Sequence, residues 1–249
     1  MSGFFWNVRG FNKHSKHMVV KDWVQKCGFQ FGCLIEKMVK ETKAKKILQK
    51  VFPSWSSIKN YDHHCLGRIW NPRVRVTPCF QSAHMITVSV LLEGMVDEVF
   101  CSFLYGYKLE EDRKELWRDI NSHQDSPIIR KKPWTVCGDF NEILSGVEHY
   151  NFDTNHDSTG MREFQDVATY CSLVDMSYQG PKFTWSKKRD SDIICKKLDR
   201  SLIYEEWMRM FPQSYSVFEA GGCSDHQRCR ISIKLDGMKP KKPFKFVKP

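Results

Sequence analysis

Apolar residues in this chain fall into short runs, and the spacing inside each run predicts its secondary structure. Alternating or continuous apolar runs of about four to eight residues are typical of strands, whereas apolar residues at every third or fourth position are typical of helices. The pattern predicts strands at 3–8, 29–35, 55–60, 66–70, 73–79, 85–92, 97–104, 133–137, 173–175, 183–185, 193–203 and 228–235. It predicts helices at 13–26, 37–51, 109–121, 159–171 and 204–210.

Strand-like runs follow one another without intervening helices between residues 55 and 104. This succession favours antiparallel pairing over strand–helix–strand units. Together with the helices before and after it, the pattern predicts an α/β (α+β) fold, a two-layer β sandwich flanked by helices. We expect one domain over 1–236. Residues 237–249, rich in lysine and proline, are expected to form a basic tail.

Composition changes this picture mainly through charge. The chain has 249 residues, of which 41% are hydrophobic and 13% aromatic, enough to bury one large core. Its formal net charge of +10 favours a polyanionic partner, with the phosphate backbone of DNA first among the candidates. No apolar run approaches the roughly 20 residues that span a bilayer, so no membrane is expected. We expect a monomer.

The positions of the cysteines indicate in which cellular compartment the protein is expected. The ten cysteines are scattered, and Cys33, Cys101, Cys137 and Cys171 lie inside apolar runs, as reduced core thiols do. The chain opens with an apolar strand-like segment that has no basic flank and no small-residue cleavage site, unlike a signal peptide. These features predict a nuclear or cytoplasmic protein that is neither secreted nor bound to a membrane.

The stretch 136–142 carries the clearest candidate chemistry. An apolar strand stops at Gly138 and is followed by Asp139 and Asn141, two residues apart with Phe140 between them. Along an extended segment, side chains two residues apart point the same way. We therefore expect Asp139 to take a proton from water while Asn141 holds the same water or a phosphate oxygen, with Phe140 buried behind them.

Other polar residues also stand at the ends of apolar runs. With the first pair they are Asn7, Glu36, Tyr105, Asp139, Asn141, Asp199, Asp225 and His226. Carboxylates without thiolates or clustered histidines favour Mg²⁺, with Mn²⁺ as the alternative. A histidine oriented by an aspartate can neutralise a phosphate oxygen in a transition state. If the strand ends converge, this set predicts metal-assisted phosphodiester hydrolysis without a small organic cofactor.

A zinc site is the competing interpretation of one member of this set. Cys223, His226 and Cys229 recur at every third residue. A structural zinc site needs four ligands, usually in paired spacing, and no second pair lies nearby in the sequence. We therefore rank zinc below the hydrolase interpretation.

Several of these residues lie in motifs that resemble a known superfamily. The motifs are Trp-Asn-Val-Arg-Gly at 6–10, Ile-Glu at 35–36, Gly-Arg-Ile-Trp at 67–70, Leu-Tyr-Gly at 104–106, Gly-Asp-Phe-Asn-Glu at 138–142, Phe-Thr-Trp at 183–185, Lys-Leu-Asp-Arg at 197–200 and Ser-Asp-His at 224–226. In this order they resemble the endonuclease/exonuclease/phosphatase (DNase I-like) superfamily. The resemblance is closest to the endonuclease domain of plant non-LTR (LINE-type) retrotransposon polyproteins. It implies a four-layer α/β/β/α sandwich and Mg²⁺-dependent nicking of DNA that leaves a 3′-hydroxyl.

The resemblance also implies a role for each matching residue. Glu36 is the expected main metal ligand, helped by Asn7 and Asp225. Asp139 activates or positions the attacking water, and Asn141 orients it. His226, held by Asp199, contacts the scissile phosphate. Tyr105 donates a hydrogen bond to a phosphate oxygen or the leaving group, and Trp185 and Arg68 are expected to contact the substrate.

The sequence departs from the superfamily pattern in two informative places. Arg9 stands where the apurinic endonucleases carry a metal-associated aspartate, and the segment 66–73 is short. Two alternatives to a DNA endonuclease therefore stay open: a phosphatase acting on a small phosphorylated substrate, and a remnant that has lost catalysis and binds nucleic acid only through charge.

Overall fold

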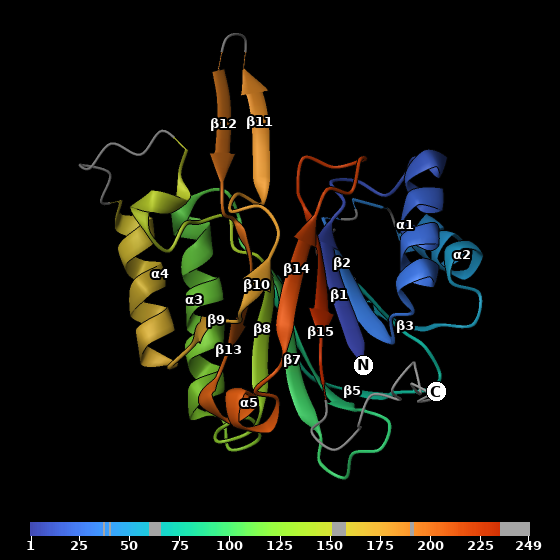
Figure 1. Ribbon diagram of the computed structural model, residues 1–249, viewed down its shortest axis with the longest axis horizontal. Helices are drawn as coiled ribbons and strands as arrows, with labels where there is room; N and C mark the ends of the chain where they lie inside the picture. Colours follow the sequence, from blue (N-terminus) through green and yellow to red (C-terminus); the bar gives the residue numbers. More distant parts are fainter. Residues whose placement is uncertain (37, 40, 60–65, 151–157, 190–191, 235–249) are drawn as a thin grey trace, which may run out of the picture.

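The computed structural model describes residues 1–36, 38–39, 41–59, 66–150, 158–189 and 192–234. The tail expected at 237–249 lies outside these residues. The described part of the chain forms two central sheets that pack face to face, with helices on both outer sides (Figure 1). This is the four-layer α/β/β/α arrangement that the resemblance predicts, so the predicted fold class is confirmed.

The first sheet is mixed. Among the described residues its strand order is β10-β14-β15-β1-β2-β4-β3. The bounds are β1 (Ser2–Asn7), β2 (Phe31–Ile35), β3 (Ser56–Lys59), β4 (Leu66–Trp70), β10 (Tyr178–Gln179), β14 (Tyr215–Glu219) and β15 (Arg228–Ser232). Strand β1 pairs in parallel with β2 and antiparallel with β15, so strands from both ends of the described chain meet in the middle of the sheet.

The second sheet has the order β5-β6-β7-β8-β13-β9 in the described residues. Its strands are β5 (Arg75–Gln81), β6 (Met85–Leu91), β7 (Val99–Tyr105), β8 (Trp134–Asp139), β9 (Val174–Asp175) and β13 (Asp199–Ile203). Strands β7 and β8 run parallel, and β8 and β13 run antiparallel. This pairing sets the carboxyl ends of β7 and β8 beside the start of β13.

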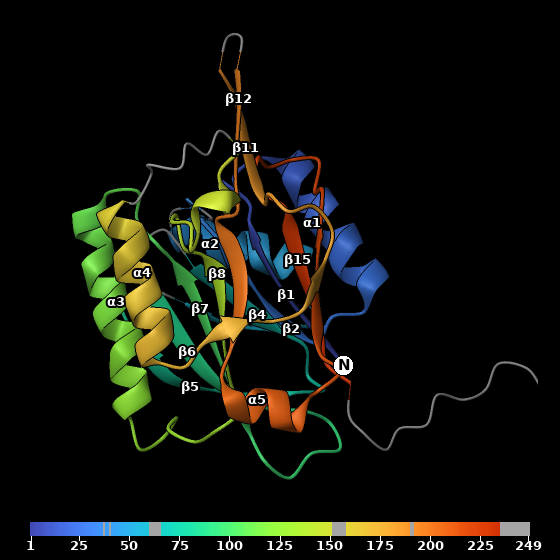
Figure 2. The same ribbon diagram turned by 60° about the vertical axis from the view of Figure 1, so that its left-hand side comes forward.

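Helices cover the outer face of each sheet. Helices α1 (His14–Cys27) and α2 (Glu41–Val51) lie on the first sheet, and α3 (Glu110–Asp125) and α4 (Thr159–Tyr170) lie on the second (Figures 1 and 2). The short elements η1 (Gly146–Glu148) and α5 (Glu205–Met210) complete the described helices. A hairpin of β11 (Trp185–Arg189) and β12 (Asp192–Lys196) projects beyond the sheets in both views.

Strand β1 shows how the sequence pattern builds these layers. Phe4 and Trp6 face α1 and pack at 5.3 Å and 5.7 Å, respectively, from the ring of Trp23. Phe5, between them, points the other way into the core between the two sheets. A strand covered on both faces needs apolar residues at successive positions, which explains why the central strands are continuous apolar runs.

A buried polar chain crosses the second sheet and reaches α3. The Trp134 indole N–H donates to Ser102 Oγ at 2.8 Å, Ser102 and Thr87 hydroxyls are 2.7 Å apart, and Thr87 Oγ1 is 2.7 Å from His123 Nε2. His123 Nδ1 lies 2.7 Å from the Asp119 carbonyl, which can only accept. Nδ1 therefore carries the hydrogen, and every donor in the chain points from Trp134 towards Asp119.

The structure corrects the predicted elements around the hairpin. The single strand expected at 193–203 is wrong: β12 pairs with β11 in the hairpin, and β13 pairs with β8 in the second sheet. The break lies at 197–198, where Thr184 Oγ1 accepts hydrogen bonds from the backbone N–H groups of Leu198 and Asp199. A side chain from a distant segment thus satisfies the backbone between the two strands.

Two further boundaries differ from the predictions. Strand β8 continues through Gly138 to Asp139, because both neighbouring strands pair with it as far as that residue. Helix α2 begins at Glu41, later than the expected start at residue 37. The extension of β8 matters most, since it brings Asp139 into the sheet instead of leaving it in a loop.

Candidate active site

Strand ends from both sheets meet at one edge of the sandwich. In the second sheet Tyr105 is in register with Asp139, and Asp139 is in register with Asp199. In the first sheet Asn7 pairs with Ile35, the residue before Glu36. Backbone register alone therefore places Tyr105, Asp139 and Asp199 side by side in the second sheet. In the first sheet it places Asn7 beside the residue before Glu36.

Asp139 and Asn141 do meet, but through a turn and not through an extended strand. Asn141 has a left-handed backbone with φ of 50°. Its backbone N–H donates to Asp139 Oδ1 at 2.9 Å, and its Nδ2 donates to the Gly106 carbonyl at 2.6 Å. Phe140 is fully buried behind the pair, as predicted, and its N–H donates to the Leu198 carbonyl.

Asn7 supports Asp139 from the first sheet. Its side chain is fully buried, and Nδ2 donates to Asp139 Oδ2 at 2.8 Å. Its Oδ1 accepts the backbone N–H of Arg9 at 3.0 Å. Both ends of the carboxamide are engaged, so in this arrangement Asn7 orients Asp139 and the turn after β1.

His226 joins Asp199 to Asp139. Its Nδ1 lies 2.9 Å from Asp199 Oδ2, and its Nε2 lies 3.7 Å from Asp139 Oδ2. Backbone pairing of His226 with Trp185 and a hydrogen bond from the Trp6 indole to the His226 carbonyl fix the ring's position. Because Asp199 accepts at Nδ1, the Nε2 edge is the one directed at Asp139.

Burial and charge shift the protonation of this trio. Burial raises the pKa of Asp139 to about 7, although the His226 imidazole acts in the opposite direction. Burial alone lowers the pKa of His226, but the Asp199 and Asp139 carboxylates outweigh it and raise the pKa to about 9. At neutral pH the imidazolium is therefore stable. A cation beside Asp139 favours the charged carboxylate.

Asp225 has a different environment from the one expected of a metal ligand. It forms an ion pair with Arg9, and its Oδ2 also accepts the Trp185 indole N–H at 2.9 Å. Burial raises the pKa of Asp225, but His226, Trp185 and Arg9 together outweigh burial and lower it. Asp225 is therefore a charged carboxylate that already has two donors.

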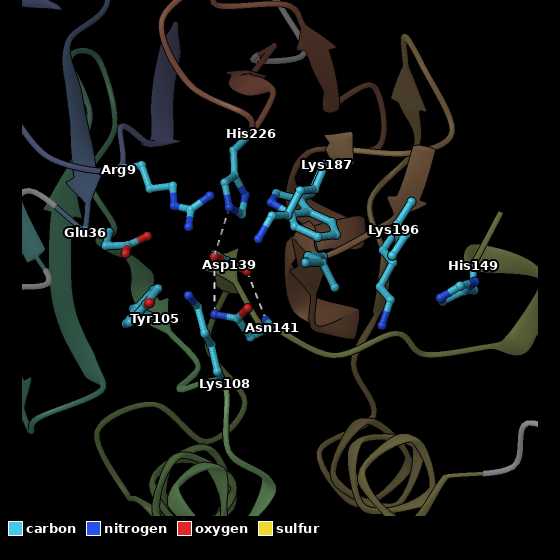
Figure 3. Close-up of a pocket in the computed structure, with 13 residues that line it drawn as sticks. Arg9, Glu36, Tyr105, Lys108, Asp139, Asn141, His149, Lys187, Lys196 and His226 are labelled. Atoms are coloured by element: carbon cyan, nitrogen blue, oxygen red, sulfur yellow. Dashed lines mark hydrogen bonds and ion pairs between the residues drawn. The ribbon is translucent and has the colours of Figure 1, made fainter. Parts of the chain in front are cut away.

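These residues border a cleft of about 500 Å³. Glu36, Tyr105, Asp139, Asn141, Trp185 and His226 line it, while Asn7, Asp199 and Asp225 stand behind the lining residues. Figure 3 shows Glu36 and Arg9 on one side of Asp139 and His226, with Lys187 and Lys196 on the other. The structure thus brings nine of the expected residues to one place.

Four basic side chains also border the cleft, namely Arg9, Lys108, Lys187 and Lys196, together with His149. The sequence interpretation did not assign a site role to Lys187, Lys196 or His149. The available signal was the density of lysine and arginine flanking the Phe-Thr-Trp and Lys-Leu-Asp-Arg motifs. An excess of positive side chains makes this cleft suited to an anionic ligand.

A buried ionic cluster supports the far wall of the cleft. Arg200, fully buried in β13, pairs with Glu148 and lies 2.6 Å from Asp175. Lys197 lies 2.9 Å from Asp175 and 3.8 Å from Glu148. Glu148 closes the capping box of η1, so the cluster fixes the segment that carries His149 next to β12.

The donor set of the cleft fits a hard divalent cation. Within the described residues, Asp139, Asp199 and His226 form the one group of carboxylates, imidazoles and thiols whose ligand atoms all lie within 4.8 Å of one another. His226 Nδ1 and Asp199 are committed to each other, however. Glu36 and Asp139 are then the carboxylates left to hold Mg²⁺ or Mn²⁺, which prefer such oxygens.

The zinc alternative is wrong for the described residues. Cys229 is packed between the two sheets, whereas Cys223 packs against the cluster under α1. Carboxylates, and not thiolates, surround His226. Arg68 also differs from the rest of the predicted set: it lies in β4, paired with Cys33, and its side chain lies outside the described residues.

No protein-family model matches the sequence, and no curated protein matches it. Solved structures do share its architecture, which is the DNase I-like α/β sandwich. Among the described residues, no helix combines the length and apolar character needed to cross a membrane.

Three solved structures illustrate the likeness. A 3′-5′ exonuclease from Neisseria meningitidis has a TM-score of 0.72 and 14% identity, covering 94% of this chain and 100% of that chain. The endonuclease domain of TRAS1, a telomere-specific non-LTR retrotransposon, has a TM-score of 0.66 and 11% identity, covering 94% and 99%. A mannosyl-6-phosphatase from Bacteroides thetaiotaomicron has a TM-score of 0.62 and 10% identity, covering 94% and 100%. At these identities the likeness establishes the fold.

Proposed function

We propose that this protein is a divalent-cation-dependent phosphodiesterase that nicks DNA, in the manner of a non-LTR retrotransposon endonuclease domain of the plant type. The observation that carries the proposal is the Asp199–His226–Asp139 relay, which opens into a cleft with Glu36 on one side and lysines on the other. Sequence motifs and fold neighbours support the same activity.

The reaction begins with water held between Asp139 and Asn141. Asp139 accepts a proton as the water oxygen bonds to phosphorus, and its partners Asn7 and Asn141 keep the carboxylate aimed. The bond from phosphorus to the 3′ oxygen breaks and this oxygen takes up a proton from solvent, which yields a 3′-hydroxyl and a 5′-phosphate. Glu36 and Asp139 would hold the divalent cation, which would supply Lewis-acid polarisation of the phosphoryl oxygen.

Charge grows on the phosphate during this step. The His226 imidazolium, kept protonated by Asp199, offers its Nε2 hydrogen to a phosphate oxygen. The Tyr105 hydroxyl donates to a second phosphate oxygen or to the leaving group. Trp185 lies beside His226, with ring centroids 6.4 Å apart, and contacts the DNA next to the cut. Arg68 is a further proposed DNA contact.

The test is nicking of supercoiled plasmid with Mg²⁺. His226→Ala and Asp139→Ala are expected to lower the nicking rate about 100-fold or more, as loss of a general base or an electrostatic stabiliser does. Matched controls are His14→Ala and Asp22→Ala, both exposed on α1. Chelation by EDTA should stop nicking, and Mg²⁺ or Mn²⁺ should restore it. Equal rates for wild type and both site variants would refute the proposal.

A phosphatase acting on a small phosphorylated substrate is the second candidate. It is favoured by the mannosyl-6-phosphatase with the same fold, and it would use the same relay. A screen for released inorganic phosphate over sugar and inositol phosphates separates the two. Phosphate release without nicking of plasmid would favour the phosphatase.

A further inference from the structure

Arg9 enters the cleft from a backbone that is fixed on both sides. It follows β1 in a left-handed conformation with φ of 46°. Its N–H donates to Asn7 Oδ1 at 3.0 Å, and the Lys16 ammonium donates to its carbonyl at 3.0 Å and to the Val8 carbonyl at 2.6 Å. Such a turn holds the origin of the side chain still, so the guanidinium has a defined direction.

Asp225 fixes the other end of this side chain. Arg9 Nη1 pairs with Asp225 Oδ2, and the Trp185 indole donates to the same oxygen. The Asp225 backbone carbonyl accepts the Ser186 N–H at 3.2 Å, which ties the residue to the hairpin. Arg9 is thus held by a carboxylate that is itself anchored to β11.

One arm of the guanidinium remains available to a ligand. Within the described part of the chain, Nη1 is the Arg9 side-chain nitrogen that has a hydrogen-bond partner, and 37% of the side chain is exposed. A guanidinium presents five N–H donors in a rigid fork that matches phosphate oxygens. Arg9 also lines the cleft with Asp139 and His226, where the reacting phosphate of the proposed function lies.

The ion pair between Arg9 and Asp225 makes binding of a divalent cation by Asp225 unfavourable. A divalent ion bound there would lie next to the guanidinium charge and be repelled by it, because the two like charges would share one carboxylate. Asp225 Oδ2 already accepts two donors. Glu36, by contrast, lines the cleft with no ion-pair partner among the described residues.

We propose that Arg9 binds a non-bridging oxygen of the scissile phosphate with its exposed arm, and that Asp225 orients Arg9 and does not bind the divalent cation. This inference rests on the proposed function, because it places a phosphodiester in the cleft. It gives the site two cationic phosphate contacts from the chain itself, Arg9 and His226, and leaves the divalent ion to Glu36 and Asp139.

Binding of a fluorescent duplex in EDTA tests the phosphate contact without cleavage. Arg9→Gln is expected to weaken binding about tenfold, the fold-change that loss of one charge-assisted hydrogen bond produces. The slope of log K against log salt should fall by about 0.9, as for one lost phosphate contact. Arg9→Lys keeps the charge and should recover part of the affinity. Arg118→Ala, which removes an exposed arginine from α3, is the matched control.

A double-mutant cycle with Asp225→Asn separates an orienting residue from a metal ligand. Asp225→Asn alone should weaken DNA binding in EDTA several-fold, because it releases Arg9. In the Arg9→Gln background the same change should have no further effect, since neighbours that act through one contact are non-additive. Equal effects of Asp225→Asn in both backgrounds would overturn the orienting role.

Binding of Mn²⁺ to the free protein, followed by electron paramagnetic resonance, gives a readout independent of catalysis. Glu36→Gln is expected to abolish Mn²⁺ binding, and Asp225→Asn to leave it within twofold of wild type. Loss of Mn²⁺ binding in Asp225→Asn would overturn the inference. If wild type binds DNA through Arg9 but nicks nothing, the proposed function fails while the phosphate contact stands. If wild type nicks DNA and Arg9→Gln binds as tightly as wild type, the inference alone fails.

Discussion

Asp199 does not line the cleft, but it raises the pKa of His226, which does. Its carboxylate sits 2.9 Å from His226 Nδ1 and is the leading cause that raises the pKa of His226 against the effect of burial. The folded-state pKa of about 9 lies above the unfolded value of 6.5. Protonation of His226 therefore stabilises the folded protein fully below pH 6.5, and this stabilisation is lost as pH rises through 9.

Replacing Asp199 by asparagine should change the pH profile of nicking. With the carboxylate neutral, burial dominates and the pKa of His226 falls. If the imidazolium is the reactive form, the alkaline limb of the rate profile should move to lower pH by at least about one unit relative to wild type. The measurement is the initial nicking rate from pH 6 to pH 10. An unmoved alkaline limb would mean that another group limits the rate there.

At the scale of elements, the chain of donors from Trp134 to Asp119 joins β6, β7, β8 and α3. The chain works as described only while His123 is neutral, because a protonated Nε2 would donate to Thr87. Since Trp134 can only donate, one hydroxyl hydrogen, of Thr87 or of Ser102, would then lose its acceptor in the chain. Burial lowers the pKa of His123 from 6.5. Stability from this neutral histidine is present above pH 6.5 and is lost as pH falls below it.

His123→Leu tests this coupling because it removes the titrating group. Wild type is expected to lose unfolding free energy through His123 as pH falls from 7.5 to 5.5, by at most about 1.4 kcal/mol, the limit for one proton over the pH unit below 6.5. The variant should lack this part of the loss, although it starts less stable at pH 7.5. Thermal melts at the two pH values measure the difference, with the exposed His14→Leu as the control. An unchanged pH dependence in His123→Leu would contradict the account.

The strands differ in how well the amino-acid sequence predicts them. Strands such as β1, β2 and β6 were predictable, because burial on both faces makes them largely apolar. The hairpin was not, since β11 is largely polar and β12 runs almost directly into β13. Nothing local marks the break at Leu198: it is held by Thr184, which satisfies the backbone of a segment fourteen residues later.

At the scale of the molecule, several basic side chains border the cleft where function is proposed. The hairpin contributes Lys187 and Lys196 to the cleft, and β7 leads to Lys108 on the opposite side. Clefts lined by one sign of charge attract ligands of the opposite sign and make the attraction dependent on salt. A polyanion longer than one phosphate can contact several of these side chains at once.

Lys187→Ala and Lys196→Ala should each weaken duplex binding and lower the slope of log K against log salt by about 0.9. The loss should be similar for unrelated DNA sequences, because phosphate contacts carry no base information. Lys26→Ala, an exposed lysine in the last turn of α1, is the control and should leave the slope unchanged. Salt-insensitive differences would indicate that these lysines do not contact phosphate.

The candidate site was predictable as a set of residues but not as a network. Their position at the ends of apolar runs, and the motifs that carry the resemblance, pointed to Asp139, Asn141, Asp199 and His226, and the structure places them together. The partnership of Arg9 with Asp225 was not predictable, because the two residues are 216 positions apart and meet only when β1 pairs with β15 in the first sheet. The cleft lysines were missed for a similar reason: the sequence alone does not show which surface lysines face the cleft.

Strand β1 has a consequence for how the molecule is made. It lies between β2 and β15, with Ser2 opposite Ser232 and the terminal ammonium 2.8 Å from the Ile233 carbonyl. Strand β1 is made before β15, so one edge of β1 stays unpaired until β15 has been synthesised. Strand pairings between residues far apart in the sequence form slowly, and the intermediates that precede them are prone to aggregate. A nascent chain halted before residue 228 would hold Asn7 and Asp139 but would lack the strand that pairs with β1, so the proposed activity should require β15 to have been made, and shorter chains should depend on chaperones.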